Sequence, residues 1–566
     1  MPTLFLAALV ACSTPSTSEP VDGADASRAD TLVVALQTDL SSLLPPVSTT
    51  AQDARLYENL LLSLLEPGFD CGLTFTPSLA TDWSWSDDGL SVTFQMRDDV
   101  MWSDGTPVTA HDVALSYELV QDPLVASPYL DWVERMVPGT PTAIDDHTVR
   151  FDFTGRYDQT TMLAHAGLFR VVQAKSVEGA DRATLRGHAA TRDPVVNGPW
   201  DIGEWKPGER ITVVPNPAYT GPEPAKLRRV IFKVLPEYAT RILELESGSV
   251  DMVQAVQIED AERLRVEHPE LEIVRRGWRS TDFLAWNRFD AADYQAKKSA
   301  ADGGEVDWDT VAPHPALSDR EVRKALSLAI NVDKLIDDLL TDRTGLSVGK
   351  RAVSTLSPAF CGAQPTVEPL PFAPEQAAQI LASRGWVDSD GDGVREKDGH
   401  ELRLRLLTNS GNPRRAAASV AIQAMLEDVG VAIEIDKLEA NTFFSRLRKK
   451  DFEVALSGWS VALFPDPSSI WHSGDRFVYN YPSYANDEVD ALLEQYSSEP
   501  DPEKGTALLA EIGRLVYEDQ PYTFLYWRDD LVAVHRRFQD RQVDFLSQWG
   551  HLNRWWVKPD EVKYPR

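Results

Sequence analysis

The stretch that decides the fold runs through twelve residues, Trp102-Ser103-Asp104-Gly105-Thr106-Pro107-Val108-Thr109-Ala110-His111-Asp112-Val113. Thr109 stands where a helix N-cap is expected, and Asp112 follows at the spacing of a capping box. Val113, Tyr117 and Val120 then recur at helical spacing and form an apolar stripe. The stretch therefore predicts a helix that begins just after Thr109.

Strand signals lie upstream of this helix. Ser91 to Met96 alternates polar and apolar residues, which is the period of a half-buried strand, and Asp88-Gly89 supplies a turn before it. Thr31 to Leu36 is a β-prone run that opens the folded part of the chain. These segments predict β-structure close to the helix.

A second helix is predicted downstream, where Ser318 and Glu321 form another capping box. Apolar residues follow at i, i+3, i+4, i+7 and i+8, namely Val322, Ala325, Leu326, Ala329 and Ile330. Breaks rich in Pro and Gly separate the blocks at 194–199, 215–224 and 358–374. The chain is therefore expected to be of mixed α/β class, without an internal repeat.

The composition bounds the class of protein and its partners. The chain has 566 residues, with 43% hydrophobic and 25% charged residues, which is typical of a globular protein of two to four domains. The formal net charge of −31 argues against nucleic acid and anionic membrane surfaces as partners, because both would repel the chain at long range.

The N-terminal segment predicts export. Leu4 to Ala11 is an apolar run too short to span a bilayer, and it resembles the core of a secretory signal peptide, although no Lys or Arg precedes it. It leads into Leu9-Val10-Ala11-Cys12, which resembles a bacterial lipobox with Cys12 as the lipidated residue. Residues 1–12 are thus expected to be a lipoprotein signal, and the polar residues 13–30 a flexible tether.

The two other cysteines, Cys71 and Cys361, lie far apart in the sequence. In an exported protein such a pair can form a disulfide, and two buried free thiols are the alternative. The sequence leaves both open.

Motifs for catalysis are absent from the sequence: there is no nucleophile elbow, Walker loop, dinucleotide fingerprint or zinc-binding His pair. The 87 acidic residues make a chance carboxylate pair unavoidable, so no particular pair indicates a glycosidase-like site.

One acidic motif is more specific. Asp388, Asp390 and Asp392 match the first half of an EF-hand calcium loop, but Gly399 stands where a bidentate Glu is needed, and a turn held by Asp side chains is the alternative.

Several segments together resemble the family 5 extracellular solute-binding proteins, the peptide/nickel-type receptors of ABC importers. The twelve-residue stretch is similar to that family's WSDG signature, and four further blocks follow in the family's order. These blocks are Asn197-Gly198-Pro199-Trp200 with Trp205 to Tyr219, Val322 to Asp333, Arg384 to Glu396, and Gly458-Trp459 with Asp466-Pro467 and Asn486 to Asp490.

The resemblance implies a fold and domain boundaries. The expected fold is α/β, a periplasmic-binding-protein-like two-lobe architecture (type II, cluster C-like) with an extra third domain. Lobe I would combine residues 31–50, 195–280 and 525–566, the extra domain would span 51–194, and lobe II would span 281–524. The two lobes would close around a ligand at the hinge.

The resemblance also implies a binding site between the lobes. The expected ligand contacts are Gln37, Leu40, Asn197, Gly198, Trp459, Ser460 and Asp466. Peptide-binding relatives place an Asp about three residues after the Trp, whereas this chain has Val461-Ala462-Leu463-Phe464 there. Peptides remain the first expectation, followed by oligosaccharides, opine-like compounds and other small solutes.

We therefore expect a substrate-binding lipoprotein of an ABC importer and not an enzyme. The expected partners are a small solute, an ABC permease complex and, through the lipid alone, the membrane; the protein would be a monomer outside the bacterial cytoplasmic membrane. No cofactor is expected beyond a structural Ca²⁺ at Asp388, Asp390 and Asp392. A membrane-tethered sensor or scaffold on the same fold, and a secreted carboxylate-dependent hydrolase, are the alternatives.

Overall fold

The computed structural model describes residues 31–134, 136–301, 306–460, 465–475 and 479–561. The predicted lipidation site Cys12, the tether 13–30 and the segment Val461 to Phe464 lie outside the described residues. Among the residues that are described, no helix combines the length and the apolar character needed to cross a membrane.

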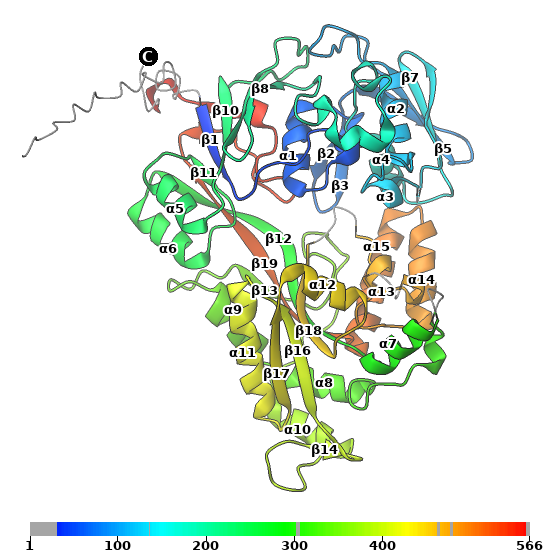
Figure 1. The fold of residues 1–566 in the computed structure, drawn as a ribbon, viewed down its shortest axis with the longest axis vertical. Helices are drawn as coiled ribbons and strands as arrows, with labels where there is room; N and C mark the ends of the chain where they lie inside the picture. Colours follow the sequence, from blue (N-terminus) through cyan, green and yellow to red (C-terminus); the bar gives the residue numbers. More distant parts are fainter. Residues whose placement is uncertain (1–30, 135, 302–305, 461–464, 476–478, 562–566) are drawn as a thin grey trace, which may run out of the picture.

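One large sheet runs through the described structure from end to end (Figure 1). Its strands are hydrogen-bonded in the order β17 (Ala432–Leu438), β16 (Arg403–Asn409), β18 (Val454–Ser460), β12 (Leu271–Trp286), β19 (Tyr522–His535), β11 (Met252–Val253), β1 (Thr31–Leu36), β10 (Arg229–Val234), β9 (Arg210–Pro215) and β8 (Trp200–Lys206). A further strand, β13 (Gly349–Arg351), pairs with β19.

The long strands β12 and β19 carry the chain from one half of the molecule to the other. Residues 271–276 of β12 pair with 530–535 of β19, and residues 280–285 pair with 522–528. Between these two stretches the register shifts, because three residues of β12 face one residue of β19. Such a bulge bends a sheet. We call residues 31–276 and 530–561 the upper body and residues 280–528 the lower body, after their places in Figure 1.

The upper body holds a second, antiparallel sheet in the order β4 (Ala80–Trp85), β5 (Ser91–Met96), β7 (Thr148–Asp152) and β6 (Thr142–Asp145). This sheet lies within the range 51–194 that was expected to form an extra domain. The remaining upper elements are α1 (Ala51–Leu60), the hairpin β2 (Leu65–Phe69) and β3 (Leu73–Pro77), α2 (Ala110–Gln121), α3 (Leu130–Glu134), α4 (Gln159–Gly167), α5 (Tyr238–Glu246), α6 (Ile258–Glu267), β20 (Phe538–Gln539) and β21 (Trp556–Val557).

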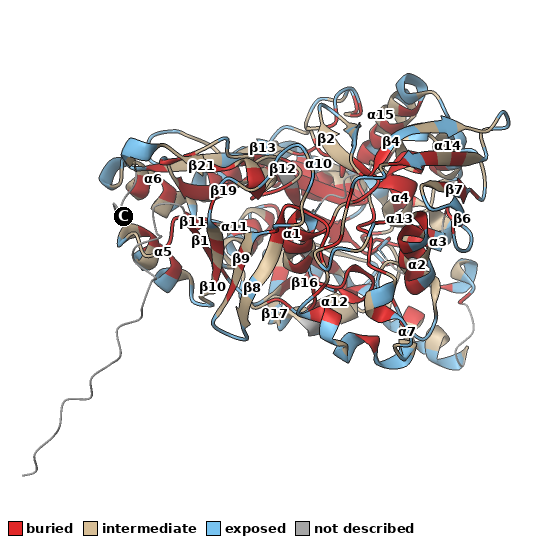
Figure 2. Ribbon diagram, turned by 90° about the horizontal axis from the view of Figure 1, so that it is seen from above, coloured by how far each residue is buried: buried red, intermediate tan, exposed pale blue. Residues whose placement is uncertain are grey.

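Helices pack on both faces of the lower half of the sheet, so its strands are buried on both sides. These lower elements are α7 (Ala291–Ala300), α8 (Arg320–Leu328), α9 (Val332–Leu340), α10 (Pro374–Ser383), α11 (Pro413–Glu427), α12 (Ala440–Arg448), α13 (Ser468–Trp471), α14 (Asp487–Ser498), α15 (Pro502–Asp519) and the small hairpin β14 (Glu396–Lys397) and β15 (His400–Glu401). Figure 2 shows buried residues concentrated along the strands of the large sheet.

The local predictions around the opening stretch are confirmed. The strand β5 spans Ser91–Met96, and α2 begins after Thr109 with the predicted capping box. Asp112 is almost fully buried. Its carboxylate also accepts hydrogen bonds from the indole N–H of Trp102 at 3.2 Å and from the backbone N–H of Ala174 at 2.7 Å. The stretch therefore ties a turn, a helix and a distant loop to one carboxylate.

The second predicted cap was wrong by one residue. The helix α8 begins at Arg320, and Asp319 is its N-cap, accepting from the backbone N–H of Glu321 at 2.9 Å. The Ser318 hydroxyl instead donates to the carbonyl of His314 at 2.7 Å, so the preceding turn uses it. The predicted apolar residues from Val322 to Ile330 are buried as expected, although α8 ends at Leu328, before the last two of them.

Candidate functional site in the space between the two bodies

The carboxyl ends of two strands from opposite bodies point toward the bulge from its two sides. Ser460, the last residue of β18, pairs with Ser280 at the bulge. The upper strand β1 runs in the opposite sense. Through β11 its residue Val34 is level with Val534 of β19, so its end, Leu36, is level with Val532, on the other side of the bulge from Arg528, the partner of Ser280. Ligands of open α/β sheets bind outside the carboxyl ends of strands. The residues that follow these two ends are therefore the candidate site.

The residues predicted to contact a ligand at these strand ends differ in their exposure. Gln37, directly after β1, is exposed, whereas Leu40, three residues further on, is buried. On the lower body Ser460 is exposed and Trp459 is half-buried. These strand ends place Gln37 on one side of the bulge and Trp459 and Ser460 on the other, and their contact with a solute stays a prediction.

Trp459 belongs to an aromatic cluster and is not a free platform. Its ring stacks on Tyr481 with centroids 4.9 Å apart, and it meets the edge of Tyr479 at 5.8 Å. Phe283 lies 5.7 Å away on the neighbouring strand and itself stacks on Tyr522 at 4.0 Å. Burial, together with the nearby Tyr479, raises the pKa of Tyr481 to about 12, so this wall is neutral at physiological pH.

Asp466 lies on the same stretch of chain but has its own structural task. It accepts a hydrogen bond from the backbone N–H of Ser468 at 2.9 Å and so holds the start of α13. It also faces Tyr496 on α14, whose pKa is raised by burial and then by the charges of Asp466 and Asp158. Asp158 belongs to the upper body, so these two carboxylates approach Tyr496 from opposite bodies.

Asn197 and Gly198 support the backbone in this structure, and their contact with a ligand stays a prediction. The Asn197 side chain is wholly buried and accepts a hydrogen bond from the N–H of Leu62 at 2.8 Å. The N–H of Gly198 donates to the carbonyl of Leu60 at 2.8 Å, and a Cβ at residue 198 would lie 2.7 Å from that carbonyl group. Both residues fix the turn against the end of α1.

Charged groups that sequence reasoning missed gather at the hinge. Asp282, on β12, is 1% exposed and receives both guanidinium groups of α11: Arg414 at 2.9 Å and Arg415 at 2.9 Å. Burial by itself would raise the pKa of Asp282, but Arg415, Arg414 and Arg528 outweigh it and hold that pKa well below its ordinary range. One Asp among 87 acidic residues carries no sequence signal for such a role.

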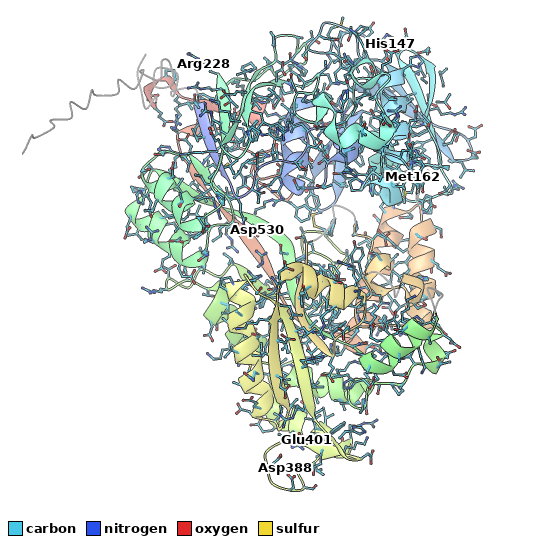
Figure 3. All side chains as sticks on the ribbon, viewed as in Figure 1. His147, Met162, Arg228, Asp388, Glu401 and Asp530 are labelled. Carbon is cyan, nitrogen blue, oxygen red and sulfur yellow. A yellow bond between two sulfur atoms is a disulfide. The ribbon has the colours of Figure 1, made fainter. Side chains whose placement is uncertain are left out.

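A second set of ion pairs lies just above, beside the bulge itself. Arg275 pairs with Asp529, and Arg528 pairs with Asp530 at 2.7 Å. Figure 3 places Asp530 between the two bodies, on the strand that joins them. The bend is therefore flanked by paired charges.

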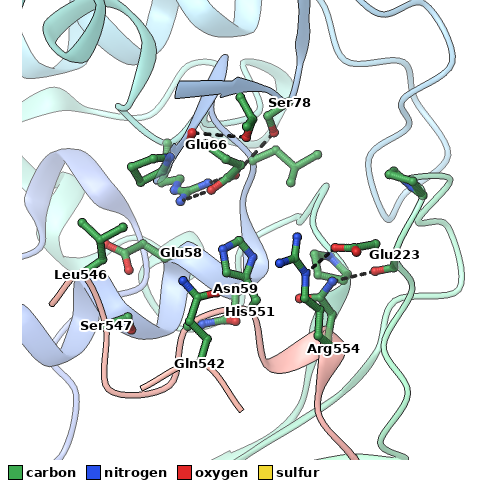
Figure 4. Close-up of a pocket in the computed structure, with 18 of the residues that line it drawn as sticks. Glu58, Asn59, Glu66, Ser78, Glu223, Gln542, Leu546, Ser547, His551 and Arg554 are labelled. Carbon is green, nitrogen blue, oxygen red and sulfur yellow. Dashed lines mark hydrogen bonds and ion pairs between the residues drawn. The ribbon is translucent and has the colours of Figure 1, made fainter. Parts of the chain in front are cut away.

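A polar cavity of about 240 Å³ lies inside the upper body, next to the Asn197 turn (Figure 4). Its wall holds two ion pairs, Glu66 with Arg170 and Glu223 with Arg554. His551 projects between Glu66 and Arg554, and burial lowers the pKa of its imidazole. Glu58 and Arg97 also line the cavity, so its wall holds as many acidic as basic side chains and presents little net charge to a ligand.

The acidic triad lies far from the interbody space, at the opposite tip of the lower body, where Figure 3 labels Asp388. Ligand oxygens of Asp388, Asp390 and Asp392 lie within 4.8 Å of one another, and all three residues are exposed. The Asp388 carboxylate accepts from the backbone of Gly391 and Gly393, so the turn held by Asp side chains is present. Calcium binding here stays a prediction.

Comparisons with known proteins agree with this arrangement. The family model described as "Bacterial extracellular solute-binding proteins, family 5 Middle" matches residues 74–481. The oligopeptide-binding protein AppA of Bacillus subtilis is 26% identical over 518 residues, covering 88% of this chain and 87% of AppA. The probable D,D-dipeptide-binding periplasmic protein DdpA of Escherichia coli is 26% identical over 478 residues, covering 81% and 80% of the two chains.

Solved structures show the same fold. The structure of AppA from Bacillus subtilis in complex with a nonapeptide aligns with a TM-score of 0.72 at 23% identity, covering 93% of this chain and 99% of that one. The structure of NikA from Brucella suis in complex with Fe(III)-EDTA gives a TM-score of 0.75 at 21% identity, with 93% and 100% covered. The expected two-lobe α/β fold is confirmed, and this chain belongs to the family 5 bacterial extracellular solute-binding proteins.

Proposed function

We propose that this protein is the solute receptor of an ABC importer, which captures a peptide-like or other small solute between its two bodies and delivers it to the permease. The observation that carries the proposal is that the carboxyl ends of β1 and β18, from opposite bodies, point toward the bulge of the two crossing strands from its two sides. A solute held there contacts both bodies, so it favours the closed state by differential contact. No chemical step is part of this function.

Peptides are the first solute class we propose. AppA and DdpA are named as oligopeptide- and D,D-dipeptide-binding proteins, whereas NikA was solved with Fe(III)-EDTA, so the family's ligands vary. In this chain Asp466 already accepts a backbone hydrogen bond and faces Tyr496. We therefore expect that it does not serve as the counter-charge of a peptide's terminal ammonium, and that recognition rests on the backbone and on the aromatic wall around Trp459.

The receptor would act outside the cytoplasmic membrane, held there by a lipid on Cys12 and lifted by the tether 13–30. The family is described as extracellular, which supports this location. We propose a monomer whose partners are the solute and the permease complex. The net charge of −31 disfavours strongly anionic solutes, since long-range repulsion would slow their capture.

The test has two steps. Native mass spectrometry of the purified protein would identify a co-purified solute, and calorimetric titration with dipeptides to nonapeptides, each with a free and an acetylated N-terminus, would test the peptide class. We expect binding that acetylation leaves nearly unchanged. Absence of binding to every peptide and every recovered solute would overturn the proposal.

A matched pair of variants locates the site. Trp459→Phe keeps the stacking on Tyr481 but removes part of the ring, whereas Trp386→Phe makes the same change in a tryptophan buried among α8, α10 and α11. We expect the first to weaken solute binding and the second to leave it unchanged. Equal effects of the two substitutions would remove Trp459 from the site.

A further inference from the structure

Besides the two crossing strands, a disulfide joins the upper and lower bodies. Cys71 lies in the short loop between β2 and β3 of the upper body, and Cys361 lies in the lower body, between β13 and α10. The Cα atoms of the pair are 4.9 Å apart, and the Cys361 N–H donates to the Cys71 carbonyl at 3.2 Å. Neither cysteine belongs to β12 or β19.

Aromatic residues from three separate segments pack beside this bond. Phe69 of the hairpin stacks on Phe545 with centroids 4.2 Å apart, and Phe360 meets the edges of both rings at 5.6 and 5.8 Å. Phe360 and Leu509 come from the lower body, whereas Phe69 and Phe545 come from the upper body. The disulfide is therefore reinforced by an apolar contact across the same boundary.

This attachment lies to one side of the crossing strands. In Figure 1 the hairpin β2–β3 and the helix α15 lie to the right of β12 and β19, and Figure 2 keeps them on that side. Cys71, Cys361 and Leu509 of α15 line a common cavity of about 220 Å³, which confirms that the hairpin and α15 are neighbours. The disulfide is thus an attachment apart from the crossing strands and apart from α6, where Arg265 pairs with Asp342 at 3.2 Å and Glu262 accepts from the N–H of Arg343.

Cys71 adopts a backbone conformation that costs energy. Its φ of +64° lies in the left-handed region, which glycine tolerates and residues with a Cβ adopt at a cost. Gly72 is the next residue in the loop. The glycine therefore stands one position away from the residue that adopts the left-handed conformation. Strained positions of this kind occur where another interaction over-determines them, and here the disulfide is that interaction.

We propose that the Cys71–Cys361 disulfide is a covalent tether that limits how far the two bodies open. This inference rests on the proposed receptor function, in which the bodies move about the β12–β19 bulge. The Cα atoms of a disulfide stay within about 7 Å of each other, so the bodies cannot separate at this point. The remaining motion is a rotation about a line through the bulge and the tether, which exposes less of the cleft than a free hinge.

The tether is open to chemical control, because both cysteines are exposed. Reduction by an added dithiol breaks the S–S bond: two electrons and two protons pass to the sulfurs of Cys71 and Cys361, and the dithiol closes to its own disulfide. Oxidation restores the tether. Exported proteins meet the oxidising conditions under which such a bond persists.

Small-angle X-ray scattering of the solute-free protein tests the inference. We expect the oxidised wild type to have a smaller radius of gyration and a shorter maximum dimension than both the reduced wild type and the Cys71→Ser/Cys361→Ser variant. Adding reductant to the double variant should change nothing, which controls for the thiol of Cys12. Identical scattering of the oxidised and reduced forms, with unchanged circular dichroism, would overturn the tether.

Hydrogen exchange gives an independent readout if reduction unfolds the chain. The amide of Cys361, which donates across the boundary, should exchange slowly in the oxidised solute-free protein, and exchange within the mixing time would contradict the inference. Neither measurement uses a solute. A failed search for the solute would therefore count against the receptor function and leave the result on the tether standing.

Discussion

Replacing Asp282 by Asn tests whether the buried charge cluster holds the lower body to the crossing strand. The Asp282 carboxylate accepts four hydrogen bonds, from Nε and Nη2 of Arg414 at 3.2 and 2.9 Å and from Nε and Nη2 of Arg415 at 3.3 and 2.9 Å. An asparagine keeps the shape but loses the charge and one acceptor oxygen. Two guanidinium groups would then lie against a neutral side chain.

The expected loss is large because the cluster is buried. Removing one partner of a buried ion pair costs about 3–5 kcal/mol, since the remaining charge is left uncompensated. The matched control is Asp99→Asn. Asp99 also pairs through both oxygens with one arginine, Arg97, at 2.7 and 2.8 Å, but its side chain is 59% exposed. Exposed pairs contribute at most about 1 kcal/mol.

Urea unfolding of the three proteins measures both effects. We expect Asp282→Asn to lower the free energy of unfolding by about 3–5 kcal/mol and Asp99→Asn by less than about 1 kcal/mol, with slopes unchanged. Hydrogen exchange in α11 and β12 should rise in the first variant alone. A loss for Asp282→Asn no greater than that for Asp99→Asn would refute the argument from burial.

The pH dependence follows from the direction of the shift. The arginines hold the pKa of Asp282 below its unfolded value of about 3.9, so the folded state binds its proton less readily. The stabilisation is fully present above that unfolded value and is lost as the pH falls through the folded pKa. The difference between wild type and Asp282→Asn should therefore be constant from neutral pH down to about pH 5 and shrink below about pH 4.

Three further predictions follow from single contacts. Gly198→Ala should lower the melting temperature, because its Cβ would lie 2.7 Å from the Leu60 carbonyl group, and backbone cannot yield as a side chain can. The Cys71→Ser/Cys361→Ser variant should lose about 2–5 kcal/mol in urea, since the bond closes a loop with a sequence separation of 290 residues; an unchanged midpoint would contradict this. His551→Asn should reduce the loss of melting temperature that the wild type shows between pH 7.5 and pH 5. Burial lowers the pKa of His551, so protonation of the unfolded chain below about pH 6.5 opposes folding, and asparagine has no such proton to bind. Asparagine also tolerates the left-handed φ of +48° at this position.

Local structure was predictable wherever one segment satisfies its own chemistry. The cap at Thr109, with Asp112 reaching back, needs residues three apart and nothing else, and the strand Ser91–Met96 follows from its own alternation. The cap of α8 was misplaced because Ser318 and Asp319 are both good caps, and the competing bond from Ser318 to the His314 carbonyl decided between them. Here a neighbour outside the motif changed the result.

The candidate site was predictable only in part. The motif containing Trp459 identified the end of β18, which points toward the bulge, but not the stacking of that ring on Tyr481. Asn197 was expected at the ligand, and the structure buries it against Leu62. A residue in a family motif, such as Asn197, can therefore stabilise the backbone, and the sequence alone does not separate this role from ligand binding.

The sequence by itself determined the family, the fold class and the local elements, because five ordered motifs and the periodicities of helix and strand can be read along the chain. The tertiary structure alone decided what meets across the molecule. It placed Asp282 against Arg414 and Arg415, and it joined Cys71 to Cys361, a pair that the sequence left open. The physical reason is that these contacts join residues more than a hundred positions apart, and their strength depends on burial, which only the packed chain creates.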